Sequence, residues 1–248
     1  KLSKKMKASV VIANYNNSNF IEECINSLNT QTYKDIEIIF FDDNSQDNSI
    51  DIIKKFANVK IIKNKYQTKY GSLNQMNAFK KSVQLSTGEV IFFLDSDDFF
   101  KKDKIEKIIN FFLENKNKKI VFDFPIIIKK DKKLNIKKKK KFFNTYWDYI
   151  HPTSCISIRK EFIDEVFYKT INNKFTDTWL DLRVLIYSKY LDEYNLIDEN
   201  LTFYRQSEDN ISSKFKKFRK LWWKRRNEAH DYYFNFMKEN NLEVKKNL

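Results

Sequence analysis

The sequence predicts an α/β fold, built on a mixed, mainly parallel sheet with helices on both faces. In the first half of the chain, short apolar runs alternate with segments of helical periodicity. The runs are apolar throughout, which is typical of parallel strands that are buried on both faces. Polar clusters follow three of the runs directly, at residues 14–16, 42–44 and 95–98. Because ligands bind beyond the carboxyl ends of the strands in such sheets, we expect the three clusters to meet at one site.

Four strands and four helices are expected in the first half. The strands are predicted at residues 8–13, 36–41, 59–62 and 90–94. Three helix starts carry a pattern that resembles a capping box, in which the first residue and the one three positions later satisfy the free N–H groups: Asn19 with Glu22, Ser72 with Gln75, and Asp103 with Glu106. Asp47 is the predicted N-cap of the remaining helix.

The second half is less regular. Strands are predicted at residues 119–128, 153–158 and 195–204, and a helix at 176–190. Residues 129–141 hold nine lysines in thirteen positions, a composition that favours a solvated loop. A basic, aromatic helix is predicted from Ile211 to about Asn240.

Composition limits the class of protein. The chain has 248 residues, of which 42% are hydrophobic, so it can bury a substantial core. No uncharged apolar run approaches the roughly 18 residues of a membrane-spanning helix, and no signal peptide is evident. Two cysteines, Cys24 and Cys155, are too few for a disulfide framework, so we expect both to be reduced and the location to be cytoplasmic. A net charge of +14 favours acidic partners, such as nucleic acid, anionic lipid or a polyanionic substrate.

The acids after the fourth strand predict a metal site. Asp95, Asp97 and Asp98 follow one of the most apolar stretches of the chain, and buried carboxylates are costly unless they are paired. Mg²⁺ or Mn²⁺ in a nucleotide site is typically held by one or two carboxylates and phosphate oxygens. The alternative is that these acids only form a turn and cap the next helix. Asp42 and Asp43 are open to the same two interpretations, although a carboxylate at this edge can also accept from a base or a ribose.

Several motifs together resemble the inverting glycosyltransferases of family 2, which have the Rossmann-like GT-A fold. They are VVIANYN, DDNSQDNS, NQMNAF followed by STGEVIFFLDSDD, and the late segment from TDTWLDLR to FYRQSEDNIS. Each motif is weak alone, but all of them occur in the family's order within about residues 7–205. The resemblance implies a glycosyltransferase domain at 1–205, with a nucleotide-binding half at about 1–100 and an acceptor half at about 101–205. Residues 206–248 would form a C-terminal helical extension.

The resemblance also implies roles for site residues. Tyr15 and Asp43 would hold the uracil or ribose of a UDP-sugar, and Asp95 would contact the ribose or the sugar. Asp97 and Asp98 would hold Mn²⁺ or Mg²⁺ against the diphosphate. The full expected set for the donor nucleotide is Ala13, Asn14, Tyr15, Asp43, Asp95 and Ser96.

Inversion requires one general base to deprotonate the acceptor hydroxyl. The family's usual late Glu-Asp pair aligns with Thr176 and Asp177, so Asp177 is the first candidate and Thr replaces the expected Glu. Asp181 is the second candidate, because it lies one helical turn later on the same face. His151 is a further candidate for acceptor binding, although a single histidine is more often structural. Arg205 could reach the diphosphate or could pair with Asp198 or Glu199.

The C-terminal segment mixes aromatic and cationic residues around Trp222 and Trp223. It could pack on the catalytic domain, or it could lie on an anionic membrane that carries a lipid-linked acceptor. Arg225 and Arg226 could instead bind an acidic glycan or a diphosphate.

The expected function is the metal-dependent transfer of a hexosyl or N-acetylhexosaminyl group from a UDP-sugar. The acceptor would be a bacterial surface glycan, such as a capsular polysaccharide or lipooligosaccharide, and the enzyme would be cytoplasmic or peripheral at the inner face of the membrane. One alternative is a basic nucleic-acid-binding protein, although acids at three strand ends would repel phosphate, so no nucleic acid is expected. Another is a catalytically inactive nucleotide-sugar-binding domain of a larger synthase.

Overall fold

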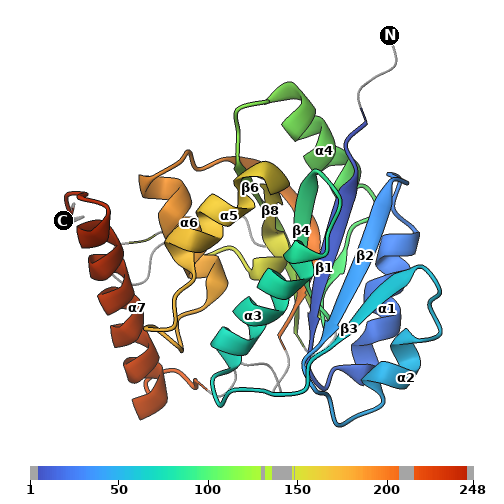
Figure 1. Ribbon diagram of the computed structural model, residues 1–248, viewed down its shortest axis with the longest axis horizontal. Helices are drawn as coiled ribbons and strands as arrows, with labels where there is room; N and C mark the ends of the chain where they lie inside the picture. The colour runs from blue at the N-terminus through green and yellow to red at the C-terminus, as the bar shows by residue number, and fades with distance from the viewer. Residues whose placement is uncertain (1–4, 130–131, 136–146, 148, 207–214, 245–248) are drawn as a thin grey trace.

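The computed structural model describes residues 5–129, 132–135, 147, 149–206 and 215–244 (Figure 1). Four parallel strands form one side of the sheet: β1 (Ala8–Asn14), β2 (Ile36–Asp42), β3 (Val59–Lys63) and β4 (Val90–Asp95). Helices connect them: α1 (Ser18–Asn29), α2 (Ser49–Ile53) and α3 (Gly71–Gln84). Val10 of β1 pairs with Ile38 of β2 and with Phe92 of β4, so β1 is central and the three strands end at the same edge.

The second half extends this sheet in a mixed way. It contains β5 (Phe99–Phe100), α4 (Lys104–Glu114), β6 (Ile120–Lys129), β7 (Lys132–Asn135), β8 (Ile156–Arg159), α5 (Ile163–Thr170), α6 (Leu180–Tyr190), β9 (Leu196–Arg205) and α7 (Lys220–Glu239). Short 3-10 turns precede β8 (Thr153–Cys155) and α5 (Lys160–Phe162). The strand order is β3-β2-β1-β4-β8-β6-β9-β5, with β7 on β6, and β8 runs antiparallel to β4. The predicted mixed, mainly parallel sheet is therefore confirmed.

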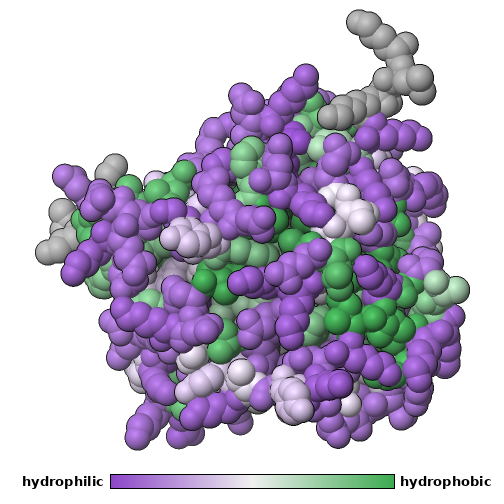
Figure 2. All heavy atoms as spheres, in the orientation of Figure 1, coloured by the Kyte–Doolittle hydropathy of each residue, from purple (hydrophilic) through white to green (hydrophobic). Residues whose placement is uncertain are grey.

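Helices cover both faces of the sheet, as the apolar strands predicted. Side chains alternate along β4: Phe92 and Leu94 pack in one buried cluster with α1 and α4, whereas Ile91 and Phe93 pack in the other with α3 and α5. Each such side chain contributes about 1.5–3 kcal/mol when it is fully buried. Hydrophilic side chains cover most of the face in Figure 2, in keeping with the net charge.

The structure corrects several local predictions. None of the three capping boxes forms, since α1, α3 and α4 have no side-chain hydrogen bond at the N-cap. The side chains of Ser72 and Gln75 point to tertiary partners instead, because they lie beside the site described below. The N-cap of α2 is Asn48 rather than the predicted Asp47, although Asp47 accepts from the backbone N–H of Ser49 in α2 and from that of Ser18 in α1.

The lysine-rich run was predicted as a loop, but Lys132–Asn135 form β7 against β6. The rest of that run, apart from Lys129, lies outside the described residues, as does the predicted start of the last helix at Ile211. The observed helix α7 begins at Lys220 and buries Ala229, Tyr232, Tyr233, Phe236 and Met237 in the same cluster as α5 and α6. The C-terminal extension is thus continuous with the main core, which confirms that it packs on the domain. No helix within the described part of the chain is long and apolar enough to cross a membrane.

Candidate active site

A cleft of about 1360 Å³ opens at the edge where β1, β2 and β4 end. Asn14 and Tyr15 line it at the end of β1, Asp43 lines it after β2, and Asp95 and Asp97 line it at the end of β4. The three predicted polar clusters therefore meet. Further lining residues come from α3, the first turn of α6, the end of β9, α7 and the segment that leads into α7.

The β1 and β2 clusters are joined by hydrogen bonds. Asn14 Nδ2 donates to Asp42 Oδ1 (2.8 Å), and Asp42 Oδ2 accepts from the N–H of Ser45 (3.0 Å). Asp42 is therefore structural. Asp43 faces the cleft, and its carboxylate accepts from Asn64 Nδ2 (2.6 Å) and Gln67 Nε2 (2.9 Å). These bonds fix the carboxylate at the cleft wall.

Tyr15 and Ala13 complete this side of the cleft. The Tyr15 side chain is 47% exposed, so its ring is accessible to a planar ligand. The carbonyl oxygen of Ala13 accepts from the N–H of Ser96 (3.1 Å), which ties the β1 end to the acid-rich loop after β4. Ser96 itself is buried, with its Oγ accepting from Asn17 Nδ2 (2.9 Å). Ser96 therefore stabilises the loop from the protein interior.

The three aspartates after β4 differ in their surroundings. Asp95 and Asp97 line the cleft, and Asp95 Oδ1 accepts from Gln75 Nε2 of α3 (2.7 Å). Asp98 is 1% exposed and is not a lining residue. Its two oxygens accept from Ser154 Oγ (2.6 Å) and from the N–H of Arg205 (2.8 Å). Asp98 thus holds the loop, and only Asp95 and Asp97 are presented to a ligand.

The electrostatics of this loop suit a bound cation. Burial, followed by the charge of Asp97, raises the pKa of Asp95 to about 8. Burial and the charges of Asp97 and Asp95 likewise raise the pKa of Asp98 well above its usual range. No group of three or more His, Cys, Asp or Glu side chains is arranged to hold a metal among the described residues. Two carboxylates nevertheless fit Mg²⁺ or Mn²⁺ when ligand phosphates supply the remaining oxygens.

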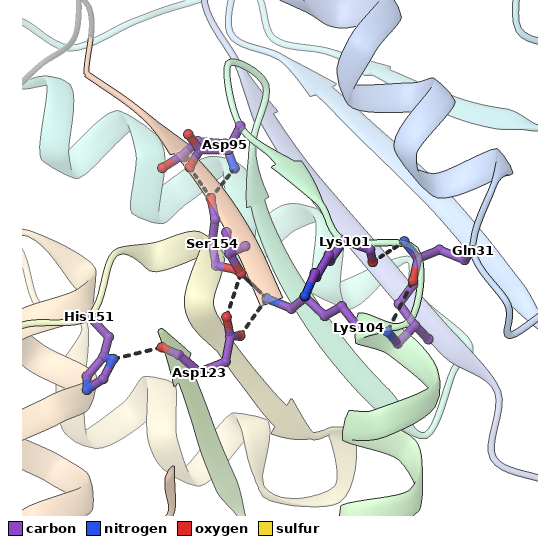
Figure 3. A network of polar contacts seen from close by, with 10 residues as sticks. Gln31, Asp95, Lys101, Lys104, Asp123, His151 and Ser154 are labelled. Carbon is purple, nitrogen blue, oxygen red and sulfur yellow. Dashed lines mark hydrogen bonds and ion pairs between the residues drawn. The ribbon is translucent and has the colours of Figure 1, made fainter. Parts of the chain in front are cut away.

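A buried ionic network lies behind the acid loop (Figure 3). Lys104 and Asp123 are both fully buried, with Lys104 Nζ 2.7 Å from Asp123 Oδ2. Lys104 Nζ also donates to the carbonyl oxygen of Ser154 (2.6 Å). Ser154 Oγ in turn accepts from the N–H of Asp95 (3.0 Å) and donates to Asp98. Ser154 therefore connects the network to the two acids.

Sequence reasoning did not identify Lys104, Asp123 or Ser154. The one available signal is the position of Lys104 on the apolar face of α4, four residues before Ile108. A lysine on a buried face needs a partner of opposite charge, but spacing alone does not identify that partner as Asp123 of β6.

The two candidate bases occupy different environments. Asp181, in the first turn of α6, lines the cleft, and burial raises its pKa to about 7 against the opposing effects of the Leu182 N–H and Arg225. Asp177 is not a lining residue, and its carboxylate lies 3.9 Å from Lys224 Nζ near the surface. The geometry favours Asp181, the second choice from sequence.

Arg205 and His151, the two candidates for binding the acceptor or the diphosphate, also differ in their positions relative to the cleft. Arg205 lines the cleft, where its Nε donates to the carbonyl oxygen of Asp97 (3.0 Å). Its salt bridge is with Glu23 of α1 (2.5 Å), not with Asp198 or Glu199.

His151 is 1% exposed and does not line the cleft. Its ring nitrogens contact the carbonyl oxygen of Asp123 (2.8 Å) and Tyr194 Oη (2.7 Å). Burial lowers its pKa to about 4. His151 is therefore a core residue packed against Phe122 and Phe124, although its neighbours Ile150 and Pro152 line the cleft. This position does not favour its predicted role in acceptor binding.

Solved structures share this fold. The structure of Staphylococcus aureus TarS 1–349 with UDP matches with a TM-score of 0.65 at 16% identity, over 94% of this chain and 71% of that one. The corresponding complex with UDP-GlcNAc matches with a TM-score of 0.61 at 17% identity, over 84% of this chain and 61% of that one. The fold is the GT-A fold of glycosyltransferases, as the sequence motifs predicted.

The chain belongs to glycosyl transferase family 2, whose model matches residues 9–180. It is 32% identical over 214 residues to an uncharacterised glycosyltransferase of Nostoc sp., covering 81% of this chain and 65% of the relative. An Escherichia coli UDP-Glc:alpha-D-GlcNAc-diphosphoundecaprenol beta-1,3-glucosyltransferase is 39% identical over 103 residues, or 42% of this chain and 40% of that one. A poly(ribitol-phosphate) beta-glucosyltransferase of Bacillus spizizenii is 37% identical over 118 residues, or 45% of this chain and 18% of that one. The chain spans less than two thirds of the length of each of these relatives.

Proposed function

We propose that this glycosyltransferase is metal-dependent and inverting, and that it moves a hexosyl or N-acetylhexosaminyl group from a UDP-sugar to a hydroxyl of a bacterial surface glycan. One observation carries the proposal: Asp43, Asp95 and Asp97 converge at one end of a cleft that also holds the half-buried Asp181. The E. coli and B. spizizenii relatives, whose names specify a lipid-linked sugar and poly(ribitol-phosphate) as acceptors, support the glycan class. Capsular polysaccharide and lipooligosaccharide are the proposed destinations.

The donor would occupy the ends of β1, β2 and β4. Tyr15 offers its exposed ring to the uracil, and Asp43 accepts from the uracil or ribose, with the backbone of Ala13 and Asn14 alongside. Asp95 and Asp97 would hold Mn²⁺ or Mg²⁺, whose chemistry is to neutralise charge on the departing diphosphate. Asp98 and Ser96 keep this loop in place rather than bind the ligand.

Asp181 would act as the general base. A carboxylate with a pKa of about 7 accepts a proton from the acceptor hydroxyl more effectively than an ordinary one. The acceptor oxygen forms its bond to the anomeric carbon as the bond to the diphosphate oxygen breaks, and the proton passes to Asp181. Attack from the face opposite the diphosphate inverts the anomeric centre.

Donor hydrolysis tests this proposal directly. Purified protein with Mn²⁺ is given a panel of UDP-sugars, and UDP release is followed with and without EDTA. Metal-dependent release from one donor is the expected result. UDP binding with no turnover, even with glycan acceptors added, would instead point to the inactive-domain alternative, which the Thr176 departure keeps open. Absence of UDP binding would contradict the proposal.

We also propose a peripheral membrane contact at the start of α7. Phe218, Leu221 and Trp223 are exposed there, at 60%, 53% and 48%, among Lys216, Lys217, Arg219, Lys220 and Lys224. Exposed aromatic residues beside cations are typical of surfaces that contact anionic lipid. Sedimentation with anionic vesicles, compared with neutral vesicles, tests this contact.

A further inference from the structure

The cleft has one cationic wall that the donor site does not require. Its charged residues are Lys216, Lys217, Arg225 and Arg226, all from α7 or the segment before it. The acids Asp43, Asp95 and Asp97 line the cleft at the ends of β2 and β4, and the other lining cations are Lys69, Lys129 and Arg205. Figure 1 shows α7 beside α6, on the side of the molecule away from β2 and β3. Four of the seven cations that line the cleft therefore come from α7 or the segment before it, and the charge of one of them, Arg225, acts on Asp181 of α6.

Hydrogen bonds fix this wall to the segment just before α6, the helix that carries the candidate base Asp181. Glu228 Oε1 accepts from the N–H groups of Asp177 (2.7 Å) and Thr178 (2.8 Å). Arg225 donates through Nε to the carbonyl oxygen of Asp177 (2.9 Å) and through a terminal nitrogen to Ser72 Oγ (3.2 Å). Arg225 is thus held at a defined position relative to α3 and the segment before α6.

Aromatic rings support the cations. The Arg225 guanidinium carbon lies 4.3 Å from the ring centroids of both Trp179 and Phe215, and that of Arg226 lies 5.4 Å from Trp222. A guanidinium stacked on rings keeps its planar geometry, which matches phosphate oxygens. Phe215 and Trp222 also line the cleft, where their faces suit a sugar ring.

We propose that this wall binds a phosphate group of the acceptor, so that the acceptor is a phosphate-bearing glycan. The inference rests on the proposed function, because it assigns the donor diphosphate to the end that holds Asp95 and Asp97. The acceptor hydroxyl must approach Asp181, and the cations of the wall lie on that side. An anionic acceptor would thereby be steered toward the base.

The experiment compares two variants with equal charge loss. Lys216→Ala/Lys217→Ala removes two cations of the wall, and Lys101→Ala/Lys102→Ala removes two exposed cations outside the cleft. Binding is measured in the presence of UDP and Mn²⁺, at two salt concentrations. Three probes share one sugar: a hexyl-diphosphate ester, a conjugate with an oligomer of alditol phosphate, and a neutral hexyl glycoside. The first two probes distinguish a lipid-linked diphosphate from a phosphodiester polymer as the source of the phosphate.

The unsubstituted protein should bind one phosphate-bearing probe at least about tenfold more tightly than the neutral glycoside. The Lys216→Ala/Lys217→Ala variant should lose most of this preference and retain UDP binding, whereas the control variant should keep both. Equal binding of the charged and neutral probes, or of a single-stranded RNA, would overturn the inference. Parallel loss of UDP binding in the Lys216→Ala/Lys217→Ala variant would assign the wall to the donor instead. UDP binding by the unsubstituted protein is scored separately, so failure of the proposed function is distinguishable.

Discussion

The donor end and the acceptor end of the cleft are built by different means. At the donor end, Asp43, Asp95 and Asp97 follow parallel strands whose register brings their ends together. At the acceptor end, Asp181 and Arg225 come from α6 and α7, and a side-chain hydrogen bond from Arg225 joins α7 to the segment before α6. The donor end is thus determined by backbone topology, and the acceptor end by packing. This difference predicts that substitutions at the two ends will affect different steps.

The largest effect is expected at the donor end. Asp97→Asn keeps the shape of the side chain but removes a charge proposed to hold the cation, so kcat/KM should fall by about 10³-fold or more and Mn²⁺-dependent UDP binding should weaken. Asp51→Asn, at an exposed acid outside the cleft, should leave both unchanged. UDP release and calorimetric UDP binding measure the two quantities. Unaltered metal dependence in Asp97→Asn would remove Asp97 from the proposed site.

At the acceptor end, Asp181→Asn should abolish transfer while UDP binding persists. Loss of a general base typically lowers the rate by about 10²- to 10⁴-fold. Asp177→Asn should change the rate by less than about threefold, because its carboxylate lies outside the cleft. Transfer assays at saturating donor compare the two variants. A greater loss in Asp177→Asn would restore the first choice made from the sequence.

The buried network behind the acid loop joins Lys104 of α4 to Asp123 of β6 and to Ser154 in the turn before β8. Substitutions in it should therefore chiefly lower the stability of the fold. Lys104→Met leaves Asp123 buried without its cation, which should lower the free energy of unfolding by about 3–5 kcal/mol. Lys107→Met, at a partly exposed salt bridge, should cost less than about 1 kcal/mol. Urea denaturation measures both. The double variant Lys104→Met/Asp123→Leu should regain most of the loss, and failure to do so would mean that packing rather than charge dominates there.

The transfer rate should depend on pH through the base. Asp181 accepts a proton only when it is ionised, and its pKa is raised to about 7, so the rate should fall as pH drops through that value. At pH 6, kcat should be about a tenth of its plateau value. The measurement requires saturating UDP-sugar and metal, because protonation of Asp95 would otherwise weaken donor binding. A flat profile between pH 6 and 8 would argue against Asp181 as the base.

The smallest effect is expected at the exposed start of α7. Trp223→Ala removes an exposed ring and should weaken binding to anionic vesicles by a few-fold, with no change in UDP binding. Tyr66→Ala, which removes another exposed aromatic residue, serves as the control because Tyr66 lies outside α7. If Trp223→Ala bound anionic vesicles as tightly as Tyr66→Ala and the unsubstituted protein, that result would contradict the membrane contact.

From the sequence alone, a mainly parallel sheet and the polar clusters that meet at its edge could be predicted, but not the strand order, β5 or β7. Apolar runs indicate buried strands, and the rule for parallel strands places their ends together, so Asn14, Asp43 and Asp95 could be assigned to one site. Residues near one another in sequence, such as Asp95, Asp97 and Asp98, could be recognised as a group. The sequence could not show which of these three carboxylates lie toward the ligand. That depends on Ser154 and Arg205, which are distant in sequence.

Only the tertiary structure decided the acceptor end. His151 lies in the core, where Phe122, Phe124 and Tyr149 pack against it. Asp181 lies in the first turn of α6 and lines the cleft, whereas Asp177 lies before that helix and does not. Arg225 and Lys104 acquired their roles from partners 48 and 19 residues away, across separate elements. Periodicity indicates which side of an element is buried, but it does not indicate which other element packs against that side. Long-range packing therefore determined the residues that the sequence could not assign.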